Sequence, residues 1–154
     1  MIRSFRIVQT SRLKTAFAGE GSRLAGGRWN FKGTPLVYSA DSLSLATLEV
    51  MANMDDYALM EKSYSYIPIE IPEPCIEFYP VDALPKGWDS HGPNETSMLI
   101  GEAWVIKRRS AVLRVPSVIT KMEWNYLINP LHPDFKKLKI GRAERLRFDS
   151  RLKK

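Results

Sequence analysis

The sequence predicts one compact α+β domain that spans residues 1–154. Its length suits a single domain with one sizeable core. Hydrophobic residues make up 44% of the chain and charged residues 26%, which is typical of a globular protein. Short apolar runs are separated by turns rich in glycine and proline, and they predict two helices among six or seven short strands.

The strands are predicted from short runs of β-branched and aromatic residues that end at proline, glycine or charged turns. The run over residues 64–71 contains Pro68, which predicts an edge position or a bulge, because proline has no amide hydrogen to donate. Residues 10–34 are predicted as a loop because they are rich in glycine and basic residues. The predicted strands cover residues 2–8, 36–39, 64–71, 76–79, 111–115 and 126–128, and a last strand lies within residues 137–147.

Each predicted helix is preceded by a residue whose side chain can accept a hydrogen bond from a free backbone N–H group. Asp41 or Ser42 caps a helix over residues 42–51, and Asn94 caps a second helix that ends near residue 107. The apolar stripe predicted on this second helix consists of Leu99, Ala103 and Ile106.

Composition excludes several classes of protein. No run of 18 apolar residues exists, and the first residues lack the apolar region of a signal peptide, so we expect a cytoplasmic protein without a membrane partner. Cys75 is the only cysteine, and we interpret it as a packed side chain rather than a nucleophile. His91 and His132 have no cysteine or histidine at the spacing of a zinc site, so we expect no metal.

The net charge of +6 comes from the C-terminal part of the chain. Residues 1–131 hold 14 basic and 14 acidic side chains, whereas residues 132–154, the basic segment, hold 9 basic and 3 acidic ones. The basic segment can meet an acidic partner protein, nucleic acid or only water. Its aromatic residues are Phe135 and Phe148, too few for base stacking, so we expect no direct binding of nucleic acid.

Glu49 is the only charged residue within residues 42–54, a largely apolar stretch predicted to be helical. At about 100° per residue, Leu45, Leu48 and Ala52 share one face, and Glu49 lies about 60° from its centre. A carboxylate in that position needs a cation, hydrogen-bond donors or a ligand. It is therefore a candidate site residue, and the alternatives are a structural ion pair or a helix edge that reaches water.

Arg28 lies in the sequence GGRWN, residues 26–30. Paired glycines let the backbone approach a ligand closely, and the guanidinium offers two parallel hydrogen bonds to phosphate. The pattern differs from the dinucleotide fingerprint, which needs a strand before it and a helix directly after it. The alternative is an ordinary surface loop anchored by a buried Trp29. The same predicted loop also holds Arg12, Lys14 and Arg23.

Three further polar residues lie at the ends of predicted strands. Tyr38 precedes the helix of Glu49, where it can stack on a flat ring, bind a sugar or phosphate, or simply be a core tyrosine. Ser117 follows Pro116, and Asn129 begins the turn-rich sequence NPLHPDF. Both residue types are also common in turns that have no ligand.

The sequences AFAGEGSRLAGGRWNFKGTPLVYSADSLSLATLEVM, VLRVPSV and NYLINPLHPDF, in this order, resemble the RES-domain family over nearly the whole chain. That family is named after an arginine, a glutamate and a serine. Matched residue by residue, these are Arg28, Glu49 and Ser117, and the accompanying tyrosine and asparagine are Tyr38 and Asn129.

The resemblance implies a toxin of a bacterial type II toxin–antitoxin module that degrades NAD⁺ by hydrolysis or phosphorolysis. It implies a fold similar to that of ADP-ribosyltransferases. The implied partner is a cognate antitoxin with a helix-turn-helix DNA-binding region and a domain that covers the active site. NAD⁺ is then the substrate, and no cofactor is expected.

The resemblance also implies roles for individual residues. Glu49 would stabilise positive charge on the ribose, Arg28 would bind the pyrophosphate, and Tyr38 would orient the nicotinamide-ribose end. Ser117 and Asn129 would position ribose or amide groups. The other predicted substrate-binding residues are Gly27, Trp29 and Arg12.

Two other activities stay open. The first is an ADP-ribosyltransferase that moves the same group onto a macromolecule. The second is a nucleic-acid-binding or RNA-cleaving toxin led by the basic segment, although the neutral balance of residues 1–131 argues against it. A catalytically silent structural partner is disfavoured, because Arg28, Tyr38, Glu49 and Ser117 are all present.

Overall fold

The computed structural model describes residues 1–54 and 62–152. Its mixture of helices and strands confirms the predicted α+β class. The strands are β1 (Ile2–Gln9), β2 (Val37–Ala40), β3 (Tyr64–Ile71), β4 (Ile76–Phe78), β5 (Val112–Pro116), β6 (Trp124–Ile128), β7 (Lys139–Ile140) and β8 (Glu144–Leu146). The helices are η1 (Thr10–Thr15), α1 (Glu20–Ala25), α2 (Leu43–Ala52), η2 (Glu73–Cys75), η3 (Val81–Ala83), α4 (Glu95–Lys107), η4 (Pro133–Lys137) and η5 (Ser150–Leu152), of which those marked η are 3-10 helices.

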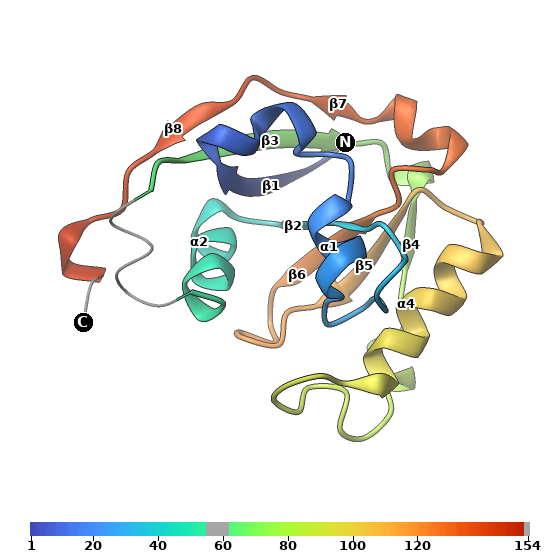
Figure 1. Ribbon diagram of the computed structural model, residues 1–154. Coiled ribbons are helices and arrows are strands. Elements are labelled where there is room, and N and C mark those ends of the chain that lie inside the picture. Colours follow the sequence, from blue (N-terminus) through green and yellow to red (C-terminus); the bar gives the residue numbers. More distant parts are fainter. Residues whose placement is uncertain (55–61, 153–154) are drawn as a thin grey trace.

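The strands form one curled sheet in the order β4-β5-β6-β2-β1-β3-β7, and β8 also pairs with β3. β1 and β2 are paired through Phe5 and Ala40 alone, so the two halves of the sheet can turn toward each other. Ile69 of β3 shares one buried cluster with Val112 of β5 and Ile128 of β6. Figure 1 shows β1, β3, β7 and β8 above β2, β5 and β6. The main core therefore lies between the two halves of the sheet.

Helix α2 begins at a capped residue and packs on the other face of the sheet. The Ser42 hydroxyl accepts a hydrogen bond from the backbone N–H of Leu45 at 3.0 Å, so Ser42 rather than Asp41 is the cap. Leu45 and Ala46 are buried with Ala40 against β1 and β2. This packing fixes the rotation of α2 about its own axis.

The apolar face predicted for α2 is wrong. Leu48 is 43% exposed and Ala52 is also exposed, whereas Leu45 and Ala46 are buried. Glu49 lies four residues after Leu45 and three after Ala46, so it belongs to the buried side. Hydrophobicity alone misplaced the face, because apolar side chains are common on protein surfaces.

Helix α4 follows the predicted cap, since the Asn94 side chain accepts a hydrogen bond from the Ser97 N–H at 3.1 Å. The predicted stripe of Leu99, Ala103 and Ile106 nevertheless faces solvent, with Leu99 55% and Ile106 70% exposed. That prediction is wrong, and the buried side of the helix is formed by Ser97, Gly101 and Trp104.

Gly101 explains how α4 packs. A Cβ atom at this position would lie 1.7 Å from the backbone oxygen of Trp29. Only glycine lets the helix come this close to the chain around Trp29. The small face of α4, and not its most apolar face, therefore supports residues 26–30.

Of the two alternatives predicted from Pro68, an edge position or a bulge, the edge position is wrong, because β3 has partners on both sides. Pro68 lies opposite Phe5 of β1, while β7 and β8 pair with β3 on its other side. Gly141 lies between β7 and β8, and its N–H donates to the Pro68 carbonyl at 2.8 Å. The missing amide hydrogen of Pro68 therefore lies opposite the gap between β7 and β8. These two short strands take the place of the single strand predicted in residues 137–147.

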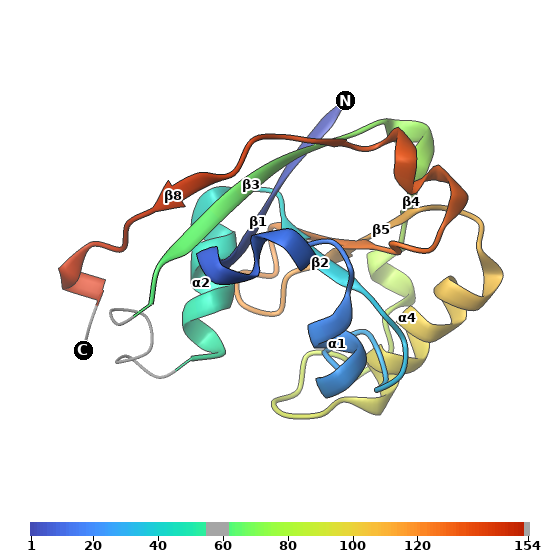
Figure 2. The ribbon, with the colours of Figure 1, turned by 45° about the horizontal axis from the view of Figure 1, so that its top comes forward.

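The basic segment is part of this sheet rather than a free tail. It supplies β7 and β8, and the ring of Phe148 contacts Tyr64 edge-on with 5.4 Å between centroids. Figure 2 shows its course along β3. Lys153 and Lys154 lie outside the described residues.

Residues 10–34 do not form the single loop that was predicted, because they contain η1 and α1. Gly19 precedes α1 with a φ of 70°, and a Cβ atom there would lie 2.7 Å from the backbone nitrogen of Leu36. The glycine-rich composition thus reflects close packing of α1 as well as turns. Within the described ranges, every helix is too short or too polar to cross a membrane.

Candidate active site

The carboxylate of Glu49, on the buried side of α2, is held by a residue of the loop after β5. The Ser117 hydroxyl donates a hydrogen bond to Glu49 Oε1 at 3.1 Å. Ser117 lies directly after β5 and is fully buried, whereas Glu49 is half-buried. Two residues that are 68 positions apart in the sequence therefore meet, as their matching motifs suggested.

The turn after β5 fixes Ser117 in place. Its N–H donates to the Glu123 carbonyl at 2.9 Å, and its carbonyl accepts from the Lys121 N–H at 2.9 Å. Its hydroxyl oxygen also accepts from the backbone N–H groups of Ile119 at 3.1 Å and Thr120 at 3.4 Å. Because the oxygen of the Ser117 hydroxyl already accepts two hydrogen bonds, the hydroxyl proton points toward Glu49.

The environment of Glu49 favours the protonated form of its carboxyl group, compared with the same group in water. Burial raises the pKa of Glu49 above its ordinary value of 4.5, and hydrogen bonds from Ser117 and Asn125 together with the charge of Arg28 work against this rise. Asn125 belongs to β6 and was not predicted as a site residue. No sequence signal marks it, because an asparagine in a strand has no distinctive spacing.

Arg28 extends from the loop after α1 to the loop before α4. Its Nη1 donates to the backbone carbonyls of Trp88 and Ser90, each at 3.1 Å. The Ser97 hydroxyl, at the start of α4, bonds to the Arg28 carbonyl at 2.5 Å. The positive charge of Arg28 lowers the pKa of both Glu49 and Tyr38, against the larger rise that burial causes.

Tyr38, Gly27 and Asn30 form a hydrogen-bonded cradle behind Arg28. The Tyr38 hydroxyl donates to Asn30 Oδ1 at 2.5 Å and accepts from the Trp29 N–H at 3.1 Å. A Cβ atom at Gly27 would lie 2.7 Å from both the Tyr38 hydroxyl and Asn30 Oδ1. Burial raises the pKa of Tyr38 well above its ordinary value of 10, so its hydroxyl stays protonated.

Two residues that organise this cradle were missed. Asn30 is fully buried, and its Nδ2 donates to the carbonyls of Ser22, Phe31 and Thr34 at 2.9 to 3.2 Å. Arg6 of β1 donates to the Tyr38 carbonyl at 2.9 Å, and burial lowers its pKa to about 10. The N of the GGRWN sequence hinted at Asn30, whereas nothing in the sequence singled out Arg6.

Trp29 packs in the core rather than at the surface. It is 2% exposed and shares a cluster with Trp104 and Leu113. Its ring also lies 5.9 Å from that of Trp88. Trp29 therefore anchors the loop of Arg28, which was the alternative explanation considered for it.

Two predicted residues make local contacts in their own segments. Asn129 lies at the far end of β6 from Asn125, about 13 Å along the strand at 3.3 Å per residue. Its side chain accepts the Leu131 N–H at 3.0 Å, which shapes the following turn. Arg12 lies in η1 and contacts Thr15 locally. Substrate contacts by Arg12 and Asn129 stay predictions.

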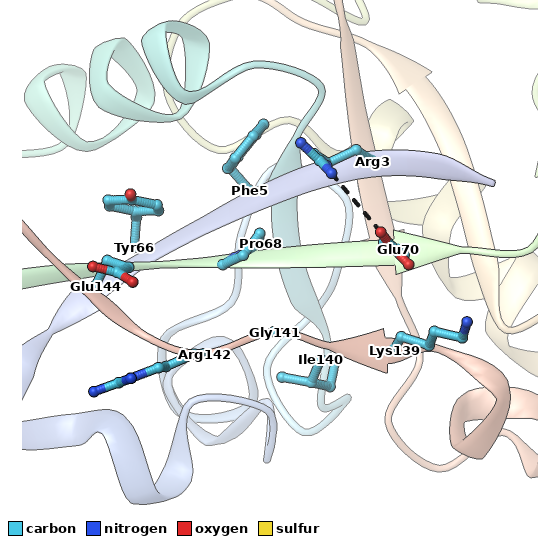
Figure 3. Close-up of a pocket in the computed structure, with 10 residues that line it drawn as sticks. All are labelled: Arg3, Phe5, Tyr66, Pro68, Glu70, Lys139, Ile140, Gly141, Arg142 and Glu144. Carbon is cyan, nitrogen blue, oxygen red and sulfur yellow. Dashed lines mark ion pairs between the residues drawn. The ribbon is translucent and has the colours of Figure 1, made fainter.

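Two shallow depressions lie elsewhere on the surface. One, of about 540 Å³, lies over β1, β3 and β7 (Figure 3), and the other, of about 400 Å³, lies beside α4. Glu70 is paired with Arg3 at 3.8 Å and Glu77 with Arg109 at 2.6 Å, and the exposed Glu144 also lines the first depression. The described residues contain no group of three histidine, cysteine or acidic side chains that could hold a metal ion. The Glu49 site is therefore the stronger candidate for chemistry.

The arrangement joins a carboxylate, a guanidinium, a protonated phenol and a buried hydroxyl. A half-buried carboxylate stabilises positive charge better than one in water, because solvent screens it less. The guanidinium suits an anionic group on the same ligand. The site is thus suited to a substrate that develops positive charge near Glu49 and carries phosphate near Arg28.

Comparison with known proteins identifies the family. The family model described as RES domain matches residues 3–149. The protein named Toxin Res from Photorhabdus laumondii is 39% identical over 152 residues, covering 97% of this chain and 96% of the relative. The protein named Prs ADP-ribosylating toxin from Sphingobium sp. is 37% identical over 138 residues, covering 88% of this chain and 85% of the relative.

A solved structure shares the fold. It is a chain in the crystal structure of the M. tuberculosis MbcT-MbcA toxin–antitoxin complex, with a TM-score of 0.77 and 18% sequence identity. The match covers 94% of this chain and 83% of that one, and it confirms the predicted fold class. Since the family model spans nearly the whole length and the relatives exceed one third identity, the chain belongs to the RES-domain family.

Proposed function

We propose that this protein is the toxin of a toxin–antitoxin pair and that it cleaves the bond between nicotinamide and ribose in NAD⁺. The observation that carries the proposal is the contact between Ser117 and Glu49, which holds a half-buried carboxylate in the field of Arg28. Membership of the RES-domain family and the toxins among its relatives support the same conclusion.

The reaction needs little from the protein beyond charge and position. When the glycosidic bond breaks, its electron pair leaves with nicotinamide, which departs as a neutral molecule. The ribose then carries positive charge, which the ionised Glu49 stabilises. Water completes the reaction by forming a new bond to the ribose and releasing a proton, or inorganic phosphate takes its place.

The remaining residues would bind and orient the substrate. Arg28 binds the pyrophosphate through Nη2 and Nε, because its Nη1 already donates to two carbonyls. Tyr38 keeps its proton, so its ring and hydroxyl offer a neutral surface to the nicotinamide-ribose end. Ser117 and Asn125 orient the Glu49 carboxylate and favour its ionised form against the effect of burial.

A second candidate function is transfer of ADP-ribose to a protein. The observation that favours it is the relative named Prs ADP-ribosylating toxin, at 37% identity. Both reactions break the same bond, and they differ only in what accepts the ribose. The geometry of Glu49, Arg28 and Ser117 suits both.

The proposed partner is a cognate antitoxin. The solved structure that shares the fold comes from a toxin–antitoxin complex, which supports a partner of this kind. An antitoxin with a helix-turn-helix region remains the expectation from the family resemblance. No direct contact of this chain with nucleic acid is proposed.

The test is to incubate purified protein with NAD⁺ in buffers with and without phosphate and to identify the products. Nicotinamide with free ADP-ribose indicates hydrolysis, and nicotinamide with phosphorylated ADP-ribose indicates phosphorolysis. A labelled protein from a cell extract, without free ADP-ribose, would favour the second candidate. Intact NAD⁺ under all conditions would contradict both.

A further inference from the structure

The loop before α4 reaches across the candidate site. We call residues 87–92 the strap. Two glycines with left-handed backbone bound it, Gly87 with a φ of 89° and Gly92 with a φ of 78°. Asn94 closes its base by donating to the Gly87 carbonyl at 2.5 Å and to the Ser90 hydroxyl at 2.9 Å. The strap is thus a defined turn held between α4 and Arg28.

The strap brings a carboxylate between two cations. Arg28 donates to the carbonyls of Trp88 and Ser90, which flank Asp89 on both sides. The Asp89 carboxylate is paired with Lys121 Nζ at 2.5 Å. Asp89 is 30% exposed and Lys121 is 57% exposed, so both side chains can reorient without disturbing the core.

One short turn links Lys121 to the catalytic region. Its N–H donates to the carbonyl of Ser117, the residue whose hydroxyl holds Glu49. Lys121 has a left-handed φ of 60°, which is uncommon for a residue other than glycine, asparagine or aspartate. The turn therefore directs Ser117 toward Glu49 and Lys121 toward the strap.

We propose that Lys121 is a second phosphate-binding cation beside Arg28, and that the Asp89 carboxylate occupies the position of that phosphate in the unliganded protein. The proposal extends the proposed function, because it identifies which residues bind the phosphate groups of the substrate or of the phosphate acceptor. Asp89 then lowers affinity by competition. An arriving phosphate takes over Lys121, and Asp89 turns to solvent.

The charges of the groups fit this exchange. The hydrogen bond from Lys121, and secondarily the nearby charges of Lys121 and Arg28, lower the pKa of Asp89, so its carboxylate is ionised at neutral pH. Inorganic phosphate carries more negative charge than one carboxylate, and so does a pyrophosphate taken as a whole; both offer more acceptor oxygens. Two cations on opposite loops can bind such a group from two sides at once, which one arginine cannot do.

The test measures binding rather than turnover. Isothermal titration with ADP-ribose and, separately, with inorganic phosphate compares the wild type with Lys121→Asn, Lys121→Arg and Asp89→Asn. Asparagine tolerates the left-handed backbone of Lys121, so the substitution removes charge with little strain. Lys86→Asn is the matched control, because Lys86 is an exposed lysine directly before the strap.

Lys121→Asn should weaken binding about tenfold, Lys121→Arg should restore most of it, and Asp89→Asn should strengthen it about threefold to tenfold. The gain from Asp89→Asn should shrink in a Lys121→Asn background, because the two residues are in contact. Weaker binding of ADP-ribose assigns Lys121 to the pyrophosphate, and weaker binding of inorganic phosphate alone assigns it to the acceptor.

Unchanged affinity for both ligands in Lys121→Asn, or an equal loss in Lys86→Asn, would overturn the proposal. Failure of the proposed function is a separate result. If the protein never consumes NAD⁺ but Lys121 and Asp89 control phosphate binding as described, this site stands and the proposed reaction falls.

Discussion

The Ser117 hydroxyl donates to Glu49 Oε1 at 3.1 Å and connects the turn after β5 with the inner side of α2. Two backbone N–H groups donate to the same hydroxyl oxygen, which aims its proton at the carboxylate. Burial raises the pKa of Glu49, and the contact with Ser117 works against this rise. It is therefore central to how this site can act on a cationic reaction intermediate.

Ser117→Ala should shift the pH dependence of turnover. The pKa of Glu49 is already raised, so activity should fall as pH drops through a value above 4.5. Loss of the hydrogen bond raises this pKa further, and the acid limb should move to higher pH. Turnover on the pH plateau should fall about tenfold to a hundredfold, as expected for a hydrogen bond to a charged group.

The measurement is the pH profile of NAD⁺ consumption for both proteins. Ser117→Thr is the matched variant, because it keeps the hydroxyl. An acid limb in Ser117→Ala that coincides with that of the wild type would mean that the hydroxyl does not control the ionisation of Glu49.

Arg28→Ala should weaken binding of ADP-ribose. The guanidinium is the best phosphate fork in the loop, and Arg23 is already paired with Glu20. Arg28→Lys should restore affinity only in part, because an ammonium cannot make two parallel hydrogen bonds. Calorimetry should show a loss of about tenfold or more in Arg28→Ala. Equal affinity in the two proteins would move the pyrophosphate site elsewhere, for instance to Arg12.

Gly27→Ala should damage the cradle behind Arg28. The new Cβ would lie 2.7 Å from the Tyr38 hydroxyl and from Asn30 Oδ1, so both must shift. Overpacking of this kind costs about 1–3 kcal/mol, which lowers Tm by several degrees in a chain of this size. Gly21→Ala is the control, because a Cβ atom there meets nothing within 4 Å. Equal Tm values for the two variants would show that Tyr38 and Asn30 can shift to make room for the new Cβ without loss of stability.

Charge reversal on the basic segment should slow docking of an antitoxin. Lys139 and Arg142 line the depression over β1 and β3 (Figure 3). Lys139→Glu with Arg142→Glu should lower the association rate and weaken its salt dependence, because exposed charges steer encounters. Turnover of the free protein should stay near that of the wild type.

Stopped-flow association with the antitoxin across a salt series measures this effect. Lys107→Glu on α4 is the control for a general change of charge. Loss of turnover with an unchanged association rate would assign the basic segment to the active site instead. Deletion of the segment is a poor test, because β7 and β8 belong to the sheet.

Several parts of the fold were predictable because their signals are local. The caps Ser42 and Asn94 are short polar side chains that precede helical residues, and both act as caps. β1, β3 and β4 follow from β-branched and aromatic composition. Motif order predicted Arg28, Tyr38, Glu49 and Ser117 as site residues, and Ser117 contacts Glu49, whereas the roles of all four stay predictions.

Other features depend on contacts that no local pattern encodes. The outward stripe of α4 follows from Gly101, whose missing side chain lets the helix approach Trp29. The pairing of β3 with β7 and β8 joins residues that are about 70 to 80 positions apart. Asn125 and Arg6 became visible only when tertiary packing placed them beside Glu49 and Tyr38.

Glu49→Gln should retain the fold. Because burial raises the pKa of Glu49, the folded protein holds that proton more tightly than the unfolded chain does. The bound proton of Glu49 therefore adds to the free energy of unfolding. This contribution is fully present when the pH is below the pKa of Glu49 in the unfolded chain. It is lost as the pH rises through the pKa of Glu49 in the folded protein. Near neutral pH an uncharged glutamine should therefore melt at the same temperature as the wild type or higher.

The most direct test is release of nicotinamide from NAD⁺ by the wild type and by Glu49→Gln, measured side by side with Tm. Glu144→Gln, at an exposed position of β8, is the control. We predict release by the wild type and the control, and a loss of about 10²–10³ or more in folded Glu49→Gln. Release at a similar rate by folded Glu49→Gln would contradict the central role of this carboxylate.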